Sequence, residues 1–148
     1  MLEKSFGRVY TKFKLNFYRS IFSRFETREA SLTAVETFCV EVIHALHMPT
    51  ISEFAKFVNI SQPNATHKIQ SLIKKEYVVK EQSPMDKRES ILKVTDKFYQ
   101  FYNISDAYIG TVMGRIREYF SPEEIAVLEK ILKVMDTELM PETEIPSD

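Results

Sequence analysis

The chain has 148 residues, of which 44% are hydrophobic and 28% are charged, and its formal net charge is −1. These values are typical of one globular domain with a sizeable core. The single cysteine excludes an internal disulfide and fits a reducing compartment. There is no run of about 18 apolar residues and no signal-peptide core after Met1, so we expect a cytoplasmic protein without a membrane partner.

The charge is unevenly distributed along the chain. Residues 60–97 carry eight Lys and Arg against five Asp and Glu, and residues 1–28 carry seven against two. Residues 118–148 carry two against nine. A chain with this separation can present a basic face to an acidic partner while its acidic end points elsewhere.

Residues 1–28 are predicted to form a long helix. Its apolar side chains recur every three or four residues and make a face too wide for one helix to bury in a small domain: Phe6, Tyr10, Phe13, Phe17 and Ile21. We expect this face to pack against a second copy of the chain. Packing within one chain is the alternative.

The next predicted helix, in residues 32–46, contains the candidates for two sensing chemistries. Cys39 lies in an apolar stripe with no obvious adjacent base, so we expect a buried, unreactive thiol. His44 and His47 can share a helix face, whereas Glu41 and His47 are six residues apart and cannot. A zinc site would need a third ligand from elsewhere. No metal site or cofactor is predicted, and a metal-sensing regulator is an alternative.

Two short helices are predicted between residues 50 and 75. The first begins with a capping box from Thr50 to Glu53 and ends at Asn59, because asparagine tolerates a left-handed backbone. Ser61 caps the second helix, and Pro63 is tolerated in its first turn. The inward face of this second helix consists of Ala65, Ile69, Leu72 and Ile73.

The outward face of the second helix has the composition of a DNA-reading surface. It is free of acidic residues, and the predicted contact residues are Ser61, Gln62, Asn64, Thr66, His67, Lys68, Ser71 and Lys74. Amides can bond adenine bidentately, hydroxyls can contact any base, and lysine or protonated histidine can bind guanine or phosphate. A polar surface helix that contacts nothing is the alternative.

A hairpin with a cationic tip is predicted to follow, since the strand-like segments YVVKEQ and SILKVT enclose the turn SPMDKRE. Arg88 suits a narrow minor groove or a phosphate, and Lys87 can bind phosphate more loosely. We expect Asp86 to fix the Arg88 guanidinium or to cap the turn. A helix pair before such a hairpin is the arrangement of a winged helix-turn-helix, whose second helix enters the major groove. A solvated turn is the alternative.

Residues 96–140 are predicted to form two further long helices. The first runs from about Asp96 to Phe120, with a buried side made of Phe98, Phe101, Tyr102, Tyr108, Ile109, Val112, Ile116 and Tyr119. The second begins at Ser121 with a capping box and a proline at its first position. Residues 141–148 form an acidic tail that we expect to fray.

Five motifs occur in one order and spacing across residues 32–97. They are Leu-Thr-x-x-Glu at the start, Ser-x-Pro-x-x-Thr in the second helix, Leu-x-Lys-Lys at its exit, Asp-x-Arg in the hairpin and a closing threonine. Together they resemble the MarR family of bacterial transcription regulators. Two positions depart from that family, because Glu76 and Phe98 stand where it usually has glycine. Glutamate at a helix C′ position implies strain or a different termination.

The resemblance implies a mainly α fold with a small β-hairpin wing. The winged helix-turn-helix lobe would occupy residues 33–95, and the helices in 1–28 and 96–140 would form a homodimer. It also implies a ligand-responsive repressor that binds a palindromic operator in double-stranded DNA. Effectors of such regulators are often small aromatic or anionic molecules. Three arginines could line the cleft that binds an effector, and these side chains serve equally well as dimer core or solvated surface: Arg19, Arg24 and Arg28.

An enzyme is not predicted. The sequence has no Gly-rich phosphate loop, no Ser/His/Asp arrangement with recognisable spacing and no paired cysteine motif. The alternative of a different class is a winged helix that binds proteins, whose recognition face would tolerate acids.

Overall fold

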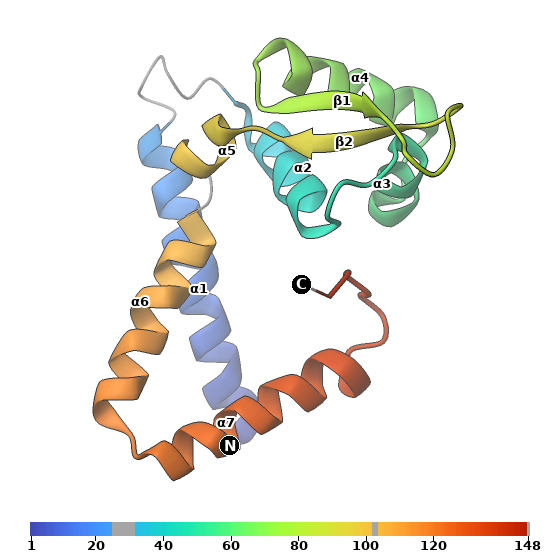
Figure 1. The fold of residues 1–148 in the computed structure, drawn as a ribbon. Helices are drawn as coiled ribbons and strands as arrows, with labels where there is room; N and C mark the ends of the chain where they lie inside the picture. The colour runs from blue at the N-terminus through green and yellow to red at the C-terminus, as the bar shows by residue number, and fades with distance from the viewer. Residues whose placement is uncertain (25–31, 102–103, 148) are drawn as a thin grey trace. The chain divides into compact units, whose positions relative to one another are not determined.

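The computed structural model describes residues 1–24, 32–101 and 104–147. In chain order its elements are α1 (Leu2–Arg24), α2 (Ala34–Ala45), α3 (Ile51–Val58), α4 (Gln62–Lys74), β1 (Val78–Gln82), β2 (Ser90–Val94), α5 (Asp96–Phe101), α6 (Ile104–Tyr119), α7 (Pro122–Val134) and the π-helical turn η1 (Met135–Leu139) (Figure 1). This confirms the mainly α fold with one hairpin. The chain divides into two units, Lys14–Ile104 and Met1–Phe13 with Ser105–Asp148.

The unit of residues 14–104 has its core where α2, α3 and α4 pack with the hairpin. α4 buries Ala65, Ile69 and Leu72, the side chains that its apolar spacing predicts. The largest fully buried side chains around them include Ile43, Phe54, Tyr77, Leu92 and Phe98. The apolar face of α4 is thus turned into the core, and its polar face is turned outward.

The hairpin is an antiparallel pair in which Val78 lies opposite Val94 and Gln82 lies opposite Ser90. It is joined to the start of α3, because Thr50 forms a β-bridge with Ile91. The base of the wing is therefore anchored to the helix pair.

The helix ends agree in part with their predicted caps. Asn59 has φ 57° and ends α3 as predicted, and Glu76, after α4, has φ 64°. The capping box predicted at Thr50 is half formed: the hydroxyl accepts from the Glu53 amide at 3.1 Å, but the carboxylate meets that hydroxyl, at 3.2 Å, instead of the Thr50 amide. The β-bridge of Thr50 constrains the backbone here.

The flanking helices differ from their prediction in the burial of their side chains. Within the helix expected from Asp96 to Phe120, α5 and α6 are described, whereas residues 102–103 and the side chain of Phe101 lie outside the described part. Phe98 is buried as predicted, whereas Tyr119 is 83% exposed and Ile109 is also exposed. Both side chains are thus exposed to solvent in the part of one copy that the structure describes.

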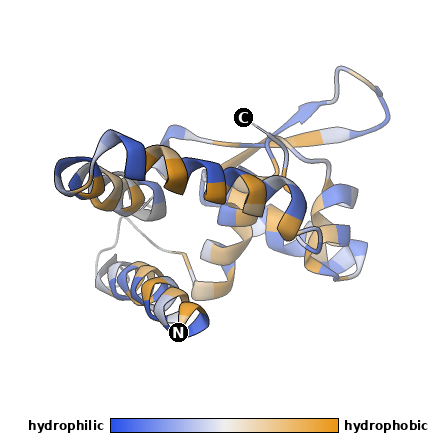
Figure 2. Cartoon of the chain, turned by 90° about the horizontal axis from the view of Figure 1, so that it is seen from below, coloured by the Kyte–Doolittle hydropathy of each residue, from blue (hydrophilic) through white to orange (hydrophobic). Residues whose placement is uncertain are grey.

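The unit that contains α6 and α7 also includes the first half of α1. Ser121 and Glu124 form the predicted capping box at the start of α7. Hydrophobic and hydrophilic residues alternate along the flanking helices, as the helix that carries the N label shows (Figure 2). In the described residues, none of the helices has the length and apolar composition that crossing a bilayer requires.

Candidate nucleic-acid interface

The N-terminal end of α4 is built from caps and a contact with α3. The Ser61 hydroxyl accepts from the Asn64 amide at 3.3 Å, so this predicted contact residue is also the N-cap. Ser52 of α3 donates to Gln62 Oε1 at 3.2 Å. Because the carboxamide oxygen is engaged, the NH₂ group of Gln62 is the part best suited to reach a base or a phosphate.

The predicted contact residues of α4 do not share one environment. The exposed ones are Ser61, Gln62, Asn64, His67 and Lys74, whereas Thr66, Lys68 and Ser71 are half-buried. Gln70 was not among the predicted contacts, yet it is exposed and lies three residues after His67 and four before Lys74. That helical spacing would have identified it.

Ser71 and Lys75 bond to α2 at the C-terminal end of α4. The Ser71 hydroxyl donates to Glu36 Oε2 at 2.7 Å, and Lys75 Nζ lies 2.8 Å from Glu36 Oε1. Glu36 also closes the capping box of α2, where Thr33 N donates to Oε1 at 3.0 Å. Burial by itself would raise the pKa of Glu36, but the hydrogen bonds from Lys75, Ser71 and Thr33 outweigh it and lower the pKa to about 2.

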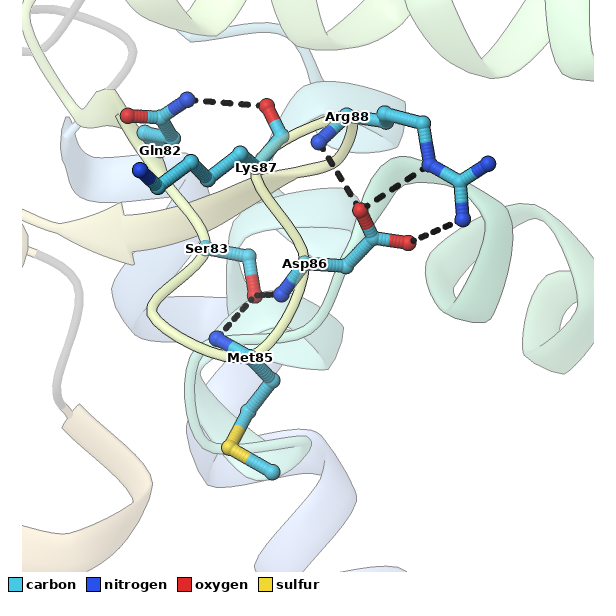
Figure 3. A network of polar contacts seen from close by, with 6 residues as sticks. All are labelled: Gln82, Ser83, Met85, Asp86, Lys87 and Arg88. Atoms are coloured by element: carbon cyan, nitrogen blue, oxygen red, sulfur yellow. Dashed lines mark hydrogen bonds and ion pairs between the residues drawn. The ribbon is translucent and has the colours of Figure 1, made fainter.

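Asp86 holds Arg88 in the wing turn in both of the ways that the sequence predicted (Figure 3). Asp86 Oδ1 accepts from the Arg88 amide at 2.9 Å and from Nε at 3.2 Å, while Oδ2 accepts from a terminal guanidinium nitrogen at 3.3 Å. These bonds hold the pKa of the Asp86 carboxyl below its usual value. The Arg88 side chain is 90% exposed, so its guanidinium is oriented at the surface.

The rest of the turn is braced by two residues that sequence reasoning missed. Ser83 is buried, and its hydroxyl accepts from the amides of Met85 and Asp86 at 3.2 and 3.4 Å. Gln82 Nε2 donates to the Lys87 carbonyl at 2.8 Å across the turn (Figure 3). A serine at the start of a turn can bond amides two and three residues ahead, and that was the available signal.

A polar cavity of about 230 Å³ lies between the starts of α3 and α4 and the wing. Its walls bring a lysine, an arginine and several hydroxyls together with one carboxylate; the lining residues are Thr50, Ile51, Ser52, Gln62, Lys80, Arg88, Glu89 and Ser90. The start of α4 and the wing therefore border one polar surface, which can offer hydrogen bonds and positive charge to an anionic polymer.

The candidate sensing residues have other surroundings. Cys39 is buried, and burial raises the pKa of its thiol, which disfavours the reactive thiolate. The His44 ring lies 4.8 Å from the ring of Phe98 and 5.5 Å from that of Tyr99, centre to centre. Within residues 1–24, 32–101 and 104–147, no three His, Cys, Asp or Glu side chains are grouped so that they could hold a metal ion.

The family model described as "MarR family" matches residues 32–90. The segment 32–90 belongs to the MarR family. The match spans α2, the helix pair and the hairpin as far as the first residue of β2. No curated protein sequence matches the chain significantly.

Solved structures similar to this chain cover nearly its whole length. The transcriptional regulator Tm0710 from Thermotoga maritima has a TM-score of 0.64 and 14% identity, over 93% of this chain and 96% of its own. FabT from Streptococcus pneumoniae in complex with DNA has a TM-score of 0.63 and 20% identity, over 97% of this chain and 100% of its own. A MepR variant from S. aureus bound to an oligodeoxyribonucleotide has a TM-score of 0.53 and 14% identity, over 95% of this chain and 99% of its own. At these identities the likeness establishes the fold.

Proposed function

We propose that the chain is a sequence-specific DNA-binding transcription regulator that acts as a homodimer on a palindromic operator. The observation that carries the proposal is the pairing of an acid-free, outward-facing α4 with a wing whose arginine is held in place by Asp86. Both belong to a MarR-family segment. Two similar structures contain DNA, which supports a nucleic-acid partner for this fold.

The division of labour follows from the chemistry of the two elements. We assign base reading to the exposed side chains Gln62, Asn64 and His67, because amides and imidazoles can bond base edges. The wing would supply a groove or phosphate contact through Arg88, with Lys87 as a looser one. Restraint of the guanidinium by Asp86 supports this role, because less side-chain freedom is lost on binding.

The homodimer is proposed from uncovered apolar surface. Phe6 and Tyr10 of α1 and Ile131 of α7 are each more than half exposed in one copy of the chain. Large exposed apolar patches commonly mark interaction sites. Two-fold symmetry would present two α4 helices to half-sites about one helical turn apart, which is the reason for expecting a palindromic operator.

Repression and a response to a small molecule are part of the proposal through the family resemblance alone. Of the three arginines considered for an effector cleft, Arg19 is in the described part, whereas Arg28 and the side chain of Arg24 lie outside it. The apolar cavity between α6 and α7 is lined by Ile116, Phe120, Glu124, Ile125 and Leu128. Among the described residues that line this cavity, the ionisable side chain is the acidic Glu124, so an anionic effector does not suit it.

Selection from a random double-stranded DNA library, with the purified chain as bait, tests the proposal. We expect enrichment of one motif with two-fold symmetry. Recovery of a library without an enriched motif, at a salt concentration where the chain still binds DNA, would reduce the function to non-specific binding. Absence of any DNA binding would favour the protein-interaction module.

A further inference from the structure

Glu36 joins α2 to the C-terminal end of α4 by hydrogen bonds that use both of its carboxylate oxygens. The residue is 9% exposed. Oε2 accepts from Ser71, and Oε1 accepts from Lys75 and from the Thr33 amide, all at 3.0 Å or less. Charge-assisted bonds of this length are directional as well as strong.

The end of α4 is held from a second side by the segment that follows β2. Lys97 Nζ donates to the Lys75 carbonyl at 3.0 Å, and the Thr95 hydroxyl donates to the Glu76 carbonyl at 2.6 Å. Glu76 itself has φ 64°, a left-handed backbone that side-chain-bearing residues rarely adopt. These bonds hold in place an exit from the helix that its local sequence would not favour.

Apart from the exposed hydrogen bond between Ser52 and Gln62 at its N-terminal end, the other described contacts of α4 with neighbouring elements are apolar and less directional. Ala65, Ile69 and Leu72 are buried, and apolar burial selects the face of a helix that is turned inward but fixes its rotation less sharply than directional bonds do. DNA reading requires a more precise helix orientation, because recognition side chains must be held within roughly 10–20° of their working orientation. The bonds to Glu36 restrict both the rotation of α4 and its position along its axis.

We propose that Glu36 is a positioning residue for DNA reading, which orients α4 through Ser71 and Lys75. Ser71 then anchors the helix, in place of the base contact that its position in the sequence predicted. This inference rests on the proposed function and deepens it, since it names a residue outside the DNA-contacting surface that determines specificity.

The test compares Glu36→Gln with Glu124→Gln, a matched control. Glu124 occupies the same position of a capping box, at the start of α7, and the substitution makes the same change of charge. Affinities are measured for the selected operator and for a random duplex. We expect Glu36→Gln to lower the ratio of operator affinity to random-duplex affinity at least tenfold without weakening binding to the random duplex. Glu124→Gln should leave this ratio unchanged.

Ser71→Ala separates anchoring from base reading and serves if Glu36→Gln does not fold. An anchor predicts that Ser71→Ala lowers discrimination across the operator and that the double variant is within threefold of Glu36→Gln alone. The inference would be overturned if Ser71→Ala lowered discrimination at one base pair alone and if this loss added to the loss caused by Glu36→Gln. An unchanged affinity ratio in a folded but destabilised Glu36→Gln or Ser71→Ala protein would also overturn it.

Amide resonances of the DNA-free protein separate this inference from the proposed function. Glu36→Gln, or Ser71→Ala in its place, should shift the resonances of α4 as far as Gln62–His67, and Glu124→Gln should not. If the unmodified chain prefers no sequence yet these resonances shift, the proposed function fails and the orienting role of Glu36 stands. If the chain discriminates between sequences and the resonances near Gln62 do not shift, the orienting role fails alone.

Discussion

Asp86 places a negative charge beside the residue that we expect to contact DNA. A carboxylate repels phosphate, yet here its oxygens accept three hydrogen bonds from Arg88. The structure therefore sets two effects of opposite sign against each other at one residue. Which effect dominates can be measured.

Asp86→Ala is expected to weaken operator binding although it removes a negative charge. Arg88→Ala should weaken it more and reduce the slope of log K against log salt by about one unit if Arg88 meets one phosphate. Arg88→Ala should not alter folding much, because Arg88 is exposed at the tip of the wing. Fluorescence anisotropy over a salt series measures both. Tighter binding by Asp86→Ala, with Arg88→Ala unchanged, would make the wing a solvated turn.

Glu36 should make folding stability depend on pH. Its pKa in the folded chain, about 2, lies below the ordinary value of 4.5, so its stabilising contribution is complete above about pH 4.5 and is lost as the pH falls through 2. The shift corresponds to at most about 3 kcal/mol. Urea unfolding at several pH values should show the stability gap between the unmodified chain and Glu36→Gln closing from pH 5 to pH 2. A constant gap would refute the assignment.

Local rules predicted the residues whose roles depend on their immediate neighbours. Asn59 in the left-handed region and the Asp86–Arg88 contact both follow from bonds within a few residues. The environment of Ser71 could not be predicted in this way, because its partner Glu36 is 35 residues distant in sequence. The motif containing Glu36 was recognised, but nothing in its spacing indicates that α4 bonds to it.

At the scale of elements, α4 presents its buried and outward faces as its periodicity predicted. Substitutions on the outward face test whether it reads the DNA sequence. Gln62→Ala or Asn64→Ala should cost about 1–3 kcal/mol on the selected operator and little on random DNA. Gln100→Ala is the control, because this exposed glutamine lies on α5. Equal losses on both duplexes would mean that these side chains do not read sequence.

The positions of the flanking helices were more predictable than the burial of their side chains. The described helices α5 and α6 both lie within the range 96–120 that the apolar pattern predicts, and residues 102–103 between them lie outside the described part. The burial of Tyr119 was predicted from the same pattern and is absent in one copy of the chain. A pattern of this kind identifies an apolar surface but does not identify what covers it.

At the scale of the molecule, the exposed apolar face of α7 should be needed for assembly. Ile131→Asp places a charge on that face, so we expect it to give monomers or aggregates, whereas we expect the unmodified chain to sediment as a dimer. Removal of everything after Ser121 should act in the same way. Lys130→Asp, an exposed charge change one residue away, should leave the dimer intact. Sedimentation of the unmodified chain as a monomer at micromolar concentration would contradict the proposed dimer.

The central claim is tested most directly by comparing two affinities at one near-physiological salt concentration. One is the affinity for the selected operator, and the other is the affinity for a scrambled duplex of equal length and composition. Sequence-specific recognition predicts a preference of about a thousandfold or more, with two chains bound per duplex. Charge-driven binding alone predicts equal affinities that fall together as salt is added. Equal affinities for the two duplexes would contradict the account.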